Sequence, residues 1–395
     1  MLILKWLGFA IGIAAITGTL ASVIHTLILP RSPGNGLAAK VPRAVWRAHF
    51  ALSRKLARYA GRDHLLALAA PASLLILLVL WLAAALVGYG LILWPLGRQS
   101  LGGAFVQAGS SMFTLGFAAP GKPASIVVAF LAAATGVVIV ALQIAYLPAL
   151  NAAYSRRETL VTMLESRAGS PAWGFELLAR HQLVGILDRL PAFYDDWERW
   201  AADVAESHTT YPVLVYFRSA RPLDSWVTGV LAVLDSAAIY LAVCPSRAPS
   251  EARLCLRMGY TCLRDIADVL RLGYDPDPVP DAPIELRYQE FAAAVSELQQ
   301  VGFPVEQAAE AAWLQFRGWR VNYESIASQL ASHLLAPPAP WAAMPAGLGD
   351  TSISPLRPVD RRPGITGPAR QPRRRSPAGR APWLAWRHRN GDAWP

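Results

Sequence analysis

The sequence predicts an all-α membrane protein with three transmembrane helices, a re-entrant half-helix between the second and third, and a soluble α-helical domain after them. Three observations predict this fold class: three long apolar runs, a half-length segment of small apolar residues, and a helical period in the chain that follows. With 54% hydrophobic and 16% charged residues, the 395-residue chain is too apolar for an ordinary soluble enzyme.

The apolar runs cover residues 6–29, 65–94 and 125–150, and none of them contains Asp, Glu, Lys or Arg. At about 1.5 Å per residue, each run is long enough to cross a hydrocarbon core of about 30 Å. We therefore expect an N-terminal transmembrane helix within residues 1–30. A cleaved signal peptide is the alternative for this run, and cleavage would leave the basic segment after it outside the membrane.

Charge predicts the orientation. The segment 31–64 contains eight Lys and Arg residues against one acid, Asp63, and Arg156 and Arg157 follow the third run. Basic segments next to membrane helices stay on the cytoplasmic side. The expected topology is a multi-pass protein of the cell inner (plasma) membrane, with its N-terminus outside and its C-terminal domain in the cytoplasm.

The basic linker 31–64 is amphipathic. A helix through it places Arg47, Arg54 and Arg58 on one face, and we expect Trp46, Phe50 and Tyr59 to meet lipid while the basic face lies on anionic headgroups. The alternative is a basic helix that is only solvated.

The link between the second and third runs contains the apolar segment 101–113, "LGGAFVQAGSSMF", which is too short to span a membrane. A short re-entrant helix is tolerated at membrane depth only where protein buries it or where it lines a water-filled cavity. The sequence T-L-G-F-A, residues 114–118, follows directly and leads through "APGKP" into the third run.

The order of outer span, half-helix, T-L-G-F-A and inner span resembles the pore module of the potassium-channel superfamily, in particular its bacterial two-span pore proteins. On that resemblance, residues 65–151 form a pore module, and four copies of the chain surround one axis within the lipid bilayer. Backbone carbonyls of the filter would replace the hydration shell of K⁺ or another monovalent cation, with no cofactor and no metal beyond that ion. The implied filter residues are Thr114, Leu115, Gly116, Phe117 and Ala118.

The resemblance also implies supporting roles around the filter. Ser110 and Ser111 stand where hydroxyls support the filter, while Leu115 and Phe117 would point away from the axis and pack against the half-helix. In the inner helix, Gln143 is a candidate pore-lining residue and Pro148 a candidate bend. Gly136 lies where this superfamily often has a hinge glycine, and simple close packing of helices is the equal alternative.

Two residues depart from the superfamily pattern. Ala118 replaces the second filter glycine, and would cost about 1–2 kcal/mol if that position needs a positive φ. Lys122 would place four positive charges around the mouth of a tetramer. They motivate an alternative function, a non-conducting membrane sensor or scaffold that acts through its helical domain.

A second filter-like sequence, V-G-Y-G at 87–90, lies inside the second apolar run, with Leu86 in place of threonine and no half-helix before it. We interpret its glycines as small packing residues of the outer helix.

Residues 152–335 have helical periodicity and are expected to form a cytoplasmic helical domain. The stretch 222–244 is long and apolar enough to be a span, but Asp235 at its middle would cost at least about 2.5 kcal/mol in lipid. A buried bundle helix is the prediction. The other expected helices cover 156–168, 172–187, 193–208, 248–272, 282–301 and 305–335.

The domain has no nucleotide-binding glycine motif and no visible nucleophile–base pair, so we expect no enzyme activity. The ligand that would gate the pore stays unidentified. The segment 206–226 resembles a stretch of bacterial two-span channel-like proteins, without an assigned role. His181 is expected to be structural. The acidic group Asp195, Asp196, Glu198, Asp203, Glu206 and His208 has no recognised metal spacing and is expected to form a solvated helix face.

The three cysteines, Cys244, Cys255 and Cys262, have no metal spacing and are expected to be reduced thiols. Residues 336–395 are rich in Pro and Arg and are expected to be disordered. For this tail, contact with anionic lipid, nucleic acid or a protein stays open beside plain solvation. We assign no nucleic-acid partner to the chain as a whole.

Overall fold

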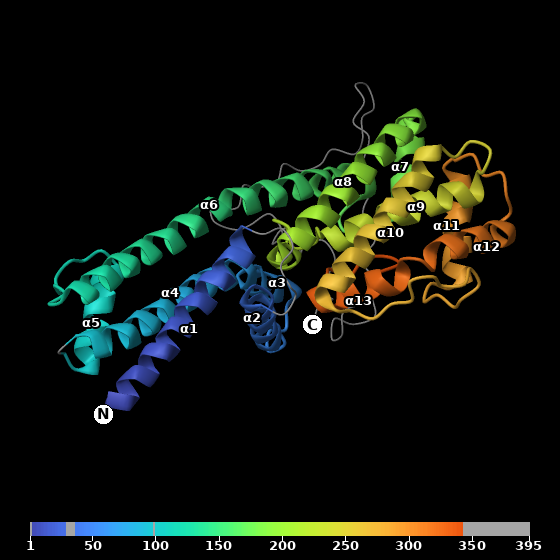
Figure 1. The fold of residues 1–395 in the computed structure, drawn as a ribbon. Coiled ribbons are helices and arrows are strands. Elements are labelled where there is room, and N and C mark those ends of the chain that lie inside the picture. Colours follow the sequence, from blue (N-terminus) through green and yellow to red (C-terminus); the bar gives the residue numbers. More distant parts are fainter. Residues whose placement is uncertain (1, 29–35, 98, 343–395) are drawn as a thin grey trace, which may run out of the picture.

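The computed structural model describes residues 2–28, 36–97 and 99–342, and within these ranges the chain is helical and forms no strand. Figure 1 shows two regions, a bundle of long apolar helices that contains the N-terminus and a helical domain at the opposite end. Four helical segments are long and apolar enough to cross a membrane, which suggests a membrane protein: Leu2–Leu27, Tyr59–Leu96, Pro123–Ala168 and Trp226–Val243.

The apolar region is built from three long helices and one short one. Helices α1 and α4 pack along each other, and the short α5 lies between α4 and α6 at the end farthest from the helical domain (Figure 1). Their bounds are α1 (Leu2–Leu27), α4 (Ala69–Leu96), α5 (Leu101–Met112) and α6 (Pro123–Ala168).

Glycines allow α1 and α4 to approach closely. A Cβ added to Gly12 would lie 2.6 Å from the carbonyl oxygen of Gly88, and one added to Gly88 would lie 2.7 Å from Ile16. A Cβ on Gly90 would meet the Phe105 ring of α5 at 2.9 Å. Close backbone approach through small residues is typical of membrane helices. The interpretation of V-G-Y-G as packing residues of the outer helix is confirmed.

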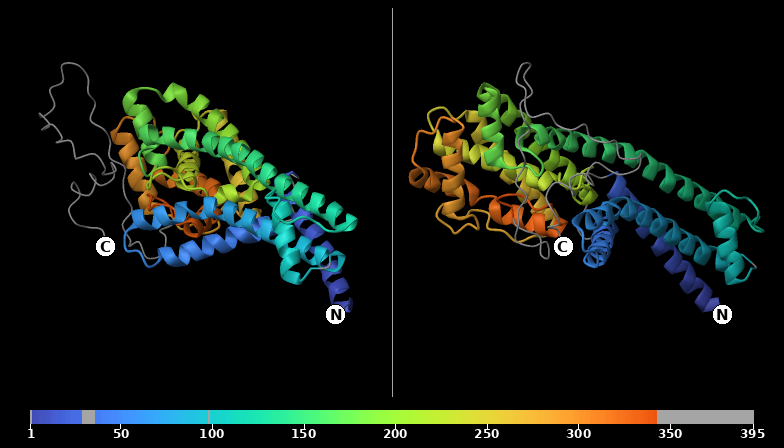
Figure 2. Two further views of the ribbon diagram at one scale, coloured as in Figure 1. Left: turned by 90° about the vertical axis from the view of Figure 1, so that its left-hand side faces the viewer. Right: turned by 180° about the vertical axis from the view of Figure 1, so that it is seen from behind.

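Helix α6 joins the two regions without a break. Its 46 residues span about 70 Å, and the helix runs through Pro148 and past residue 151, where the sequence predicts the pore module to end. The separate helix expected at 156–168 is therefore the C-terminal part of α6. Its residues Ala153, Val161 and Leu164 are buried, and both views of Figure 2 show α6 running from α5 into the helical domain.

The helical domain surrounds α9, in which all 18 residues are buried. The prediction that this stretch is a bundle helix is confirmed. The elements of the domain are α7 (Gly174–Val184), η1 (Leu187–Arg189), α8 (Leu190–Thr210), η2 (Pro212–Tyr216), α9 (Trp226–Val243), α10 (Ser250–Leu270), α11 (Tyr288–Gln300), α12 (Ala309–Arg320) and α13 (Glu324–Leu334).

Protein partners explain how α9 tolerates a carboxylate at its centre. Asp235 accepts hydrogen bonds from Arg320 at 2.7 Å and from the hydroxyl of Tyr323 at 2.9 Å, and Arg320 also pairs with Glu324 at 2.7 Å. The single helix expected at 305–335 is wrong, because the chain turns between α12 and α13. This turn brings Arg320, Tyr323 and Glu324 together beside Asp235.

The expected start of the disordered tail at residue 336 is also wrong. Ala336 and Ala339 are buried, and Trp341 packs on Phe316 while its carbonyl oxygen accepts a hydrogen bond from Arg320. This segment therefore closes one side of the helical core. Residues 343–395 of the predicted tail lie outside the described ranges.

The aromatic face of the basic linker packs on protein, not on lipid. Trp46, in α2 (Leu37–Ser53), is 2% exposed, and its indole donates to the carbonyl oxygen of His333 at 3.1 Å. Tyr59, which begins α3 (Tyr59–Ala67), is 6% exposed and donates to the carbonyl oxygen of Leu335. The expectation that these two rings meet lipid is wrong, since the helical domain offers them both apolar cover and a hydrogen-bond acceptor. Phe50 is half-buried.

Candidate functional site

Helix α5 enters the apolar region and stops part-way. It begins at Ser100, whose hydroxyl accepts a hydrogen bond from the amide of Gly103 at 3.2 Å. Ala104 and Ala108 are fully buried on its packed side. Its last residue, Met112, contacts α6 at Gly136, about 20 Å from the start of α6. A hydrocarbon core is about 30 Å thick, so a point about 20 Å along a helix that crosses it would lie inside the core.

Ser110 organises the segment that follows α5. Its carbonyl oxygen accepts the amides of Leu115 at 2.8 Å and Gly116 at 3.2 Å, and its hydroxyl accepts the amide of Ala118 at 3.0 Å. A trans peptide unit holds its N–H and C=O antiparallel. The carbonyl groups of Thr114, Leu115 and Phe117 therefore point away from Ser110 and from the end of α5.

These carbonyl groups have no hydrogen-bond partner in the part of the chain that the structure describes. Among the described residues, no hydrogen bond ends on a carbonyl oxygen of residues 114–117, and each of these residues is exposed. The segment thus offers a row of free acceptor oxygens. Because α5 ends beside them, the negative end of its dipole adds to their attraction for a cation.

The backbone between Ser110 and Ala118 alternates in handedness. Thr114 has φ 54° and Gly116 has φ 71°, whereas Leu115 between them is not in the left-handed region. For a β-branched residue such as Thr114 this conformation costs about 1–2 kcal/mol. Strain of this kind persists where surrounding structure enforces it, and it clusters at functional sites.

The replacement of glycine by Ala118 has no such cost. Among the described non-glycine residues with positive φ, Ala118 is absent, so its side chain needs no left-handed backbone. Ser111 contributes its carbonyl oxygen, which accepts the amide of Thr114 at 3.0 Å. Of the two predicted support residues, only Ser110 uses its hydroxyl on the filter segment.

Two side chains of the segment lie differently from the expectation. Leu115 is 63% exposed and Phe117 is 67% exposed, so neither packs against α5 of its own chain. Helix α6 also exposes large apolar side chains, including Phe130 at 71% and Ile144 at 63%. The single chain therefore leaves apolar side chains exposed on the segment after α5 and on α6, which water would not favour.

The predicted inner-helix residues occupy three different environments. A Cβ on Gly136 would lie 2.2 Å from the carbonyl oxygen of Met112, which favours the close-packing alternative over a hinge. Gln143 is 5% exposed, inside the chain, and its Oε1 atom has no hydrogen-bond partner among the described residues. Pro148 is exposed on a helix that continues through it.

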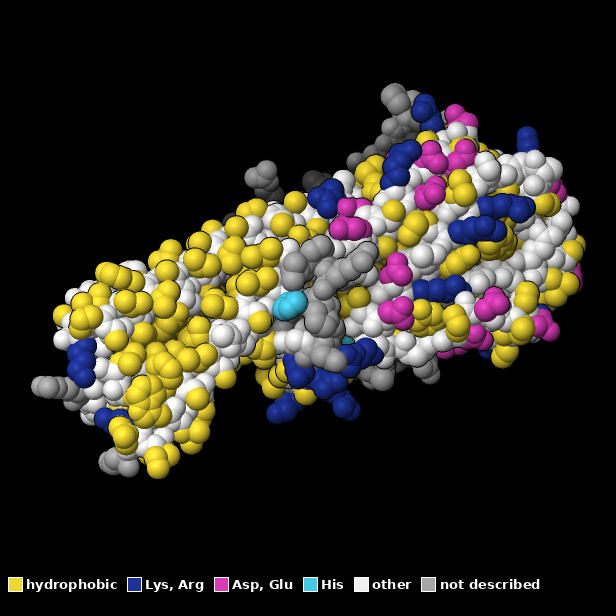
Figure 3. Space-filling view, viewed as in Figure 1, with side chains coloured by type: hydrophobic (Ala, Val, Ile, Leu, Met, Phe, Trp, Pro, Cys, Tyr) yellow, Lys and Arg dark blue, Asp and Glu magenta, His cyan; other side chains and the backbone are white. Residues whose placement is uncertain are grey.

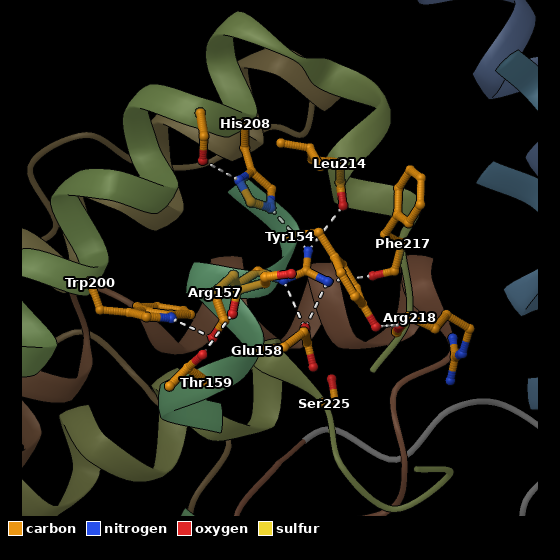
Figure 4. A network of polar contacts seen from close by, with 12 residues as sticks. Tyr154, Arg157, Glu158, Thr159, Trp200, His208, Leu214, Phe217, Arg218 and Ser225 are labelled. Atoms are coloured by element: carbon orange, nitrogen blue, oxygen red, sulfur yellow. Dashed lines mark hydrogen bonds and ion pairs between the residues drawn. The ribbon is translucent and has the colours of Figure 1, made fainter. Parts of the chain in front are cut away.

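A polar network joins α6 to the helical domain (Figure 4). Its centre is Arg157, which is fully buried and donates to the carbonyl oxygens of Leu214 at 3.0 Å and Phe217 at 2.7 Å. Its guanidinium also pairs with Glu158 at 2.8 Å. From the sequence, Arg157 is expected only to mark the cytoplasmic side of the third apolar run; its position next to an apolar helical face is the signal that could have revealed its burial.

The network also explains the distinctive segment 206–226. Arg157 donates to Nε2 of His208 at 3.0 Å, which requires a neutral imidazole with its proton on Nδ1, facing the hydroxyl of Ser207. Burial, together with the Arg157 charge, holds the pKa of His208 well below its usual range. Residues of this segment therefore form part of the contact between α6 and the helical domain, beside the packing of α6 on α7 and α9.

The other candidates stay structural. Asp195 and Asp196 pair with Arg199 on an exposed helix face, and Asp203 pairs with Arg156, while His208 is buried apart from them. Within the described ranges no group of His, Cys, Asp and Glu has the arrangement of a metal site. His181 is buried, and its Nδ1 lies 2.7 Å from a backbone carbonyl. The three cysteines are buried and free, and burial raises the pKa of each thiol.

The described residues define a helical protein with several helices apolar enough to cross a membrane, and its most unusual feature is the strained segment after α5. No protein-family model matches the chain, and neither a curated protein nor a solved structure matches it. Its function is therefore argued from its own geometry.

Proposed function

We propose that the chain is one subunit of a homotetrameric cation channel, or channel-like pore protein, in which Thr114–Ala118 is the filter and K⁺ the expected ion. The observation that carries this proposal is the row of unbonded carbonyl groups that Ser110 turns away from α5. A cation that sheds its water needs such oxygen ligands on several sides.

The depth of the segment supports an aqueous axis. Each unsatisfied backbone group that faces hydrocarbon costs several kcal/mol, and irregular backbone at membrane depth is tolerated only against protein or water. Since the chain leaves the carbonyls of Thr114, Leu115 and Phe117 free, a shared water-filled axis is the environment that satisfies them.

The exposed apolar side chains support several copies around that axis. Leu115, Phe117 and the exposed face of α6 would be covered by neighbouring subunits or by lipid. Four copies would place four filter segments around one path. In this arrangement, the Arg157 network transmits movement of the helical domain to α6, because α6 is continuous from the filter region to the domain.

Ion flux into liposomes tests the filter. The change Gly116→Ala forces a side chain into φ 71° and should disfavour the filter conformation by about 1–2 kcal/mol, or about 5- to 30-fold in population. We expect K⁺ or Rb⁺ uptake to fall by about tenfold or more. The matched control is Gly121→Ala, since Gly121 has no positive φ and open space around it. Equal uptake by wild type and Gly116→Ala would remove Thr114–Ala118 as the filter.

Lys122 favours a second function, a non-conducting membrane sensor or scaffold. It is exposed at the start of α6, close in sequence to the filter, and four such charges would oppose cation entry. The variant Lys122→Gln separates the two functions. A channel should conduct better after this change, whereas a scaffold should pass no ion with either residue and should retain a soluble partner of the helical domain.

A further inference from the structure

The basic face of α2 and the turn after it has no acidic partner within residues 2–28, 36–97 and 99–342. Within 36–68 the only acid is Asp63, which is buried and pairs with Arg218. Five cations of this segment are exposed and make no ion pair within the described ranges: Lys40, Arg47, Arg54, Lys55 and Arg58.

Packing fixes the direction of this face. Lys40, Arg47 and Arg54 follow one another at seven-residue spacing, so they share one side. On the opposite side Val45 and Trp46 are buried. Trp46 stacks on Tyr216 of η2 with ring centroids 5.2 Å apart, which holds the helix against the domain with its cations outward.

The face lies beside the inner end of the apolar helices. The segment connects the end of α1 to the start of α4, so its two ends are at the same level. Figure 1 looks along α2 while α1, α4 and α6 run across the picture, and the left view of Figure 2 shows α2 from the side. The helix therefore crosses the direction of the apolar helices, as a helix along a membrane surface would.

Figure 3 shows a group of Lys and Arg side chains that projects at the level where the apolar region ends, while Asp and Glu on this face of the molecule lie over the helical domain. Anionic lipids attract such cations at roughly 1 kcal/mol per Lys or Arg near the surface. We propose that this exposed face, formed by Lys40, Arg47, Arg54, Lys55 and Arg58, binds the headgroups of anionic phospholipids.

The binding would be through charge and hydrogen bonds alone. The aromatic side of α2 is occupied by the helical domain, so the helix does not insert its rings as an amphipathic anchor does. Arginine suits this task because its planar guanidinium donates two parallel hydrogen bonds to phosphate oxygens. The proposal requires that α1 and α4 cross a bilayer; it does not require that the protein conducts ions.

Lipid binding to the full-length protein in detergent tests this site. Native mass spectrometry would count phosphatidylglycerol against phosphatidylcholine bound to wild type and to Arg47→Gln/Arg54→Gln/Arg58→Gln. We expect the wild type to bind more phosphatidylglycerol than phosphatidylcholine. In the triple variant, the ratio of the two bound lipids should fall by at least about tenfold. Arg47→Lys/Arg54→Lys/Arg58→Lys keeps the charge and should keep most of the preference.

A charge-matched control removes three other exposed arginines, in Arg247→Gln/Arg253→Gln/Arg257→Gln, and should leave the preference unchanged. Retention of the preference by the first triple variant, or equal loss in the control, would overturn the proposal. A single-stranded RNA and inorganic phosphate complete the experiment. Competition by RNA without any lipid preference would assign the face to nucleic acid instead, and equal binding of inorganic phosphate would show that no lipid is recognised.

Discussion

At the scale of single residues, buried charge decides how α6 is held to the helical domain. Arg157 has no exposure to water, so its guanidinium depends on the carbonyls of Leu214 and Phe217, on Glu158 and on His208. Removing one partner of a buried charge leaves the other unsatisfied, which costs about 3–5 kcal/mol. The network therefore tolerates little change, and burial together with the Arg157 charge holds the pKa of its histidine, His208, well below the usual range.

The first prediction at this scale concerns pH. Because the pKa of His208 is depressed in the folded protein, the imidazole stays neutral there while the unfolded chain takes up a proton below about pH 6.5. This stabilising contribution is complete above that pH and is lost as pH falls through the folded pKa. The free energy of unfolding should therefore fall by about 1.4 kcal/mol per pH unit below pH 6.5.

Thermal unfolding in detergent between pH 5 and 8 measures this slope. The variant His208→Gln retains an acceptor for Arg157 but cannot take up a proton. Its free energy of unfolding should therefore fall less steeply below pH 6.5, by about 1.4 kcal/mol per pH unit. The variant His25→Gln changes an exposed histidine of α1 and serves as the control. An unchanged slope in His208→Gln would show that other groups, such as buried His181 or half-buried His333, account for the acid sensitivity.

At the scale of elements, uninterrupted apolar runs predicted helices that match α1, α4 and α9, and the half-length apolar segment predicted α5, because burial in lipid or in a core requires apolar residues throughout. It did not predict which partner an apolar face meets. The sequence positions of Trp46 and Tyr59 are compatible with contact to lipid or to protein. Only their tertiary contacts decide between these two environments.

The candidate filter shows the same limit. The residue types of T-L-G-F-A are visible in the sequence. The two hydrogen bonds that the Ser110 carbonyl oxygen accepts and the strain at Thr114 depend on backbone geometry, which the sequence does not show. Periodicity also carries no information on where a helix stops when the next segment is helical too. The continuity of α6 and the turn between α12 and α13 were missed for that reason.

The element-scale prediction concerns the contact between α5 and α6. In Gly136→Ala, the new methyl group would lie 2.2 Å from the carbonyl oxygen of Met112, so α5 or α6 must shift. Overpacking of this kind costs about 1–3 kcal/mol. We expect a lower melting temperature and, because Met112 leads into the filter segment, a loss of ion uptake. The variant Gly18→Ala, at a helical glycine with open space around it, should change neither quantity. A melting temperature equal to that of wild type would mean that Gly136 is not packed as described.

At the scale of the whole molecule, the single chain leaves large apolar side chains exposed outside the helical core. The helical domain has a closed core around α9, yet the filter segment and one side of α6 remain exposed, with free carbonyl groups next to large apolar side chains. Lipid covers apolar side chains but cannot satisfy carbonyl groups. In the proposed channel, protein neighbours around a water-filled axis would satisfy both surfaces, and a closed ring of identical chains would supply them.

The oligomeric state is the prediction at this scale. Native mass spectrometry of the purified protein should give four times the chain mass of 42.7 kDa. A charge on the covering side chains should break the ring, so Phe130→Glu, on the exposed face of α6, is expected to shift the protein to smaller species. Leu254→Glu, a half-exposed apolar position of α10 in the helical domain, is the matched control and should leave four copies together. A folded wild type that is monomeric or dimeric would exclude a four-fold pore, since neither state encloses an axis with four filter segments.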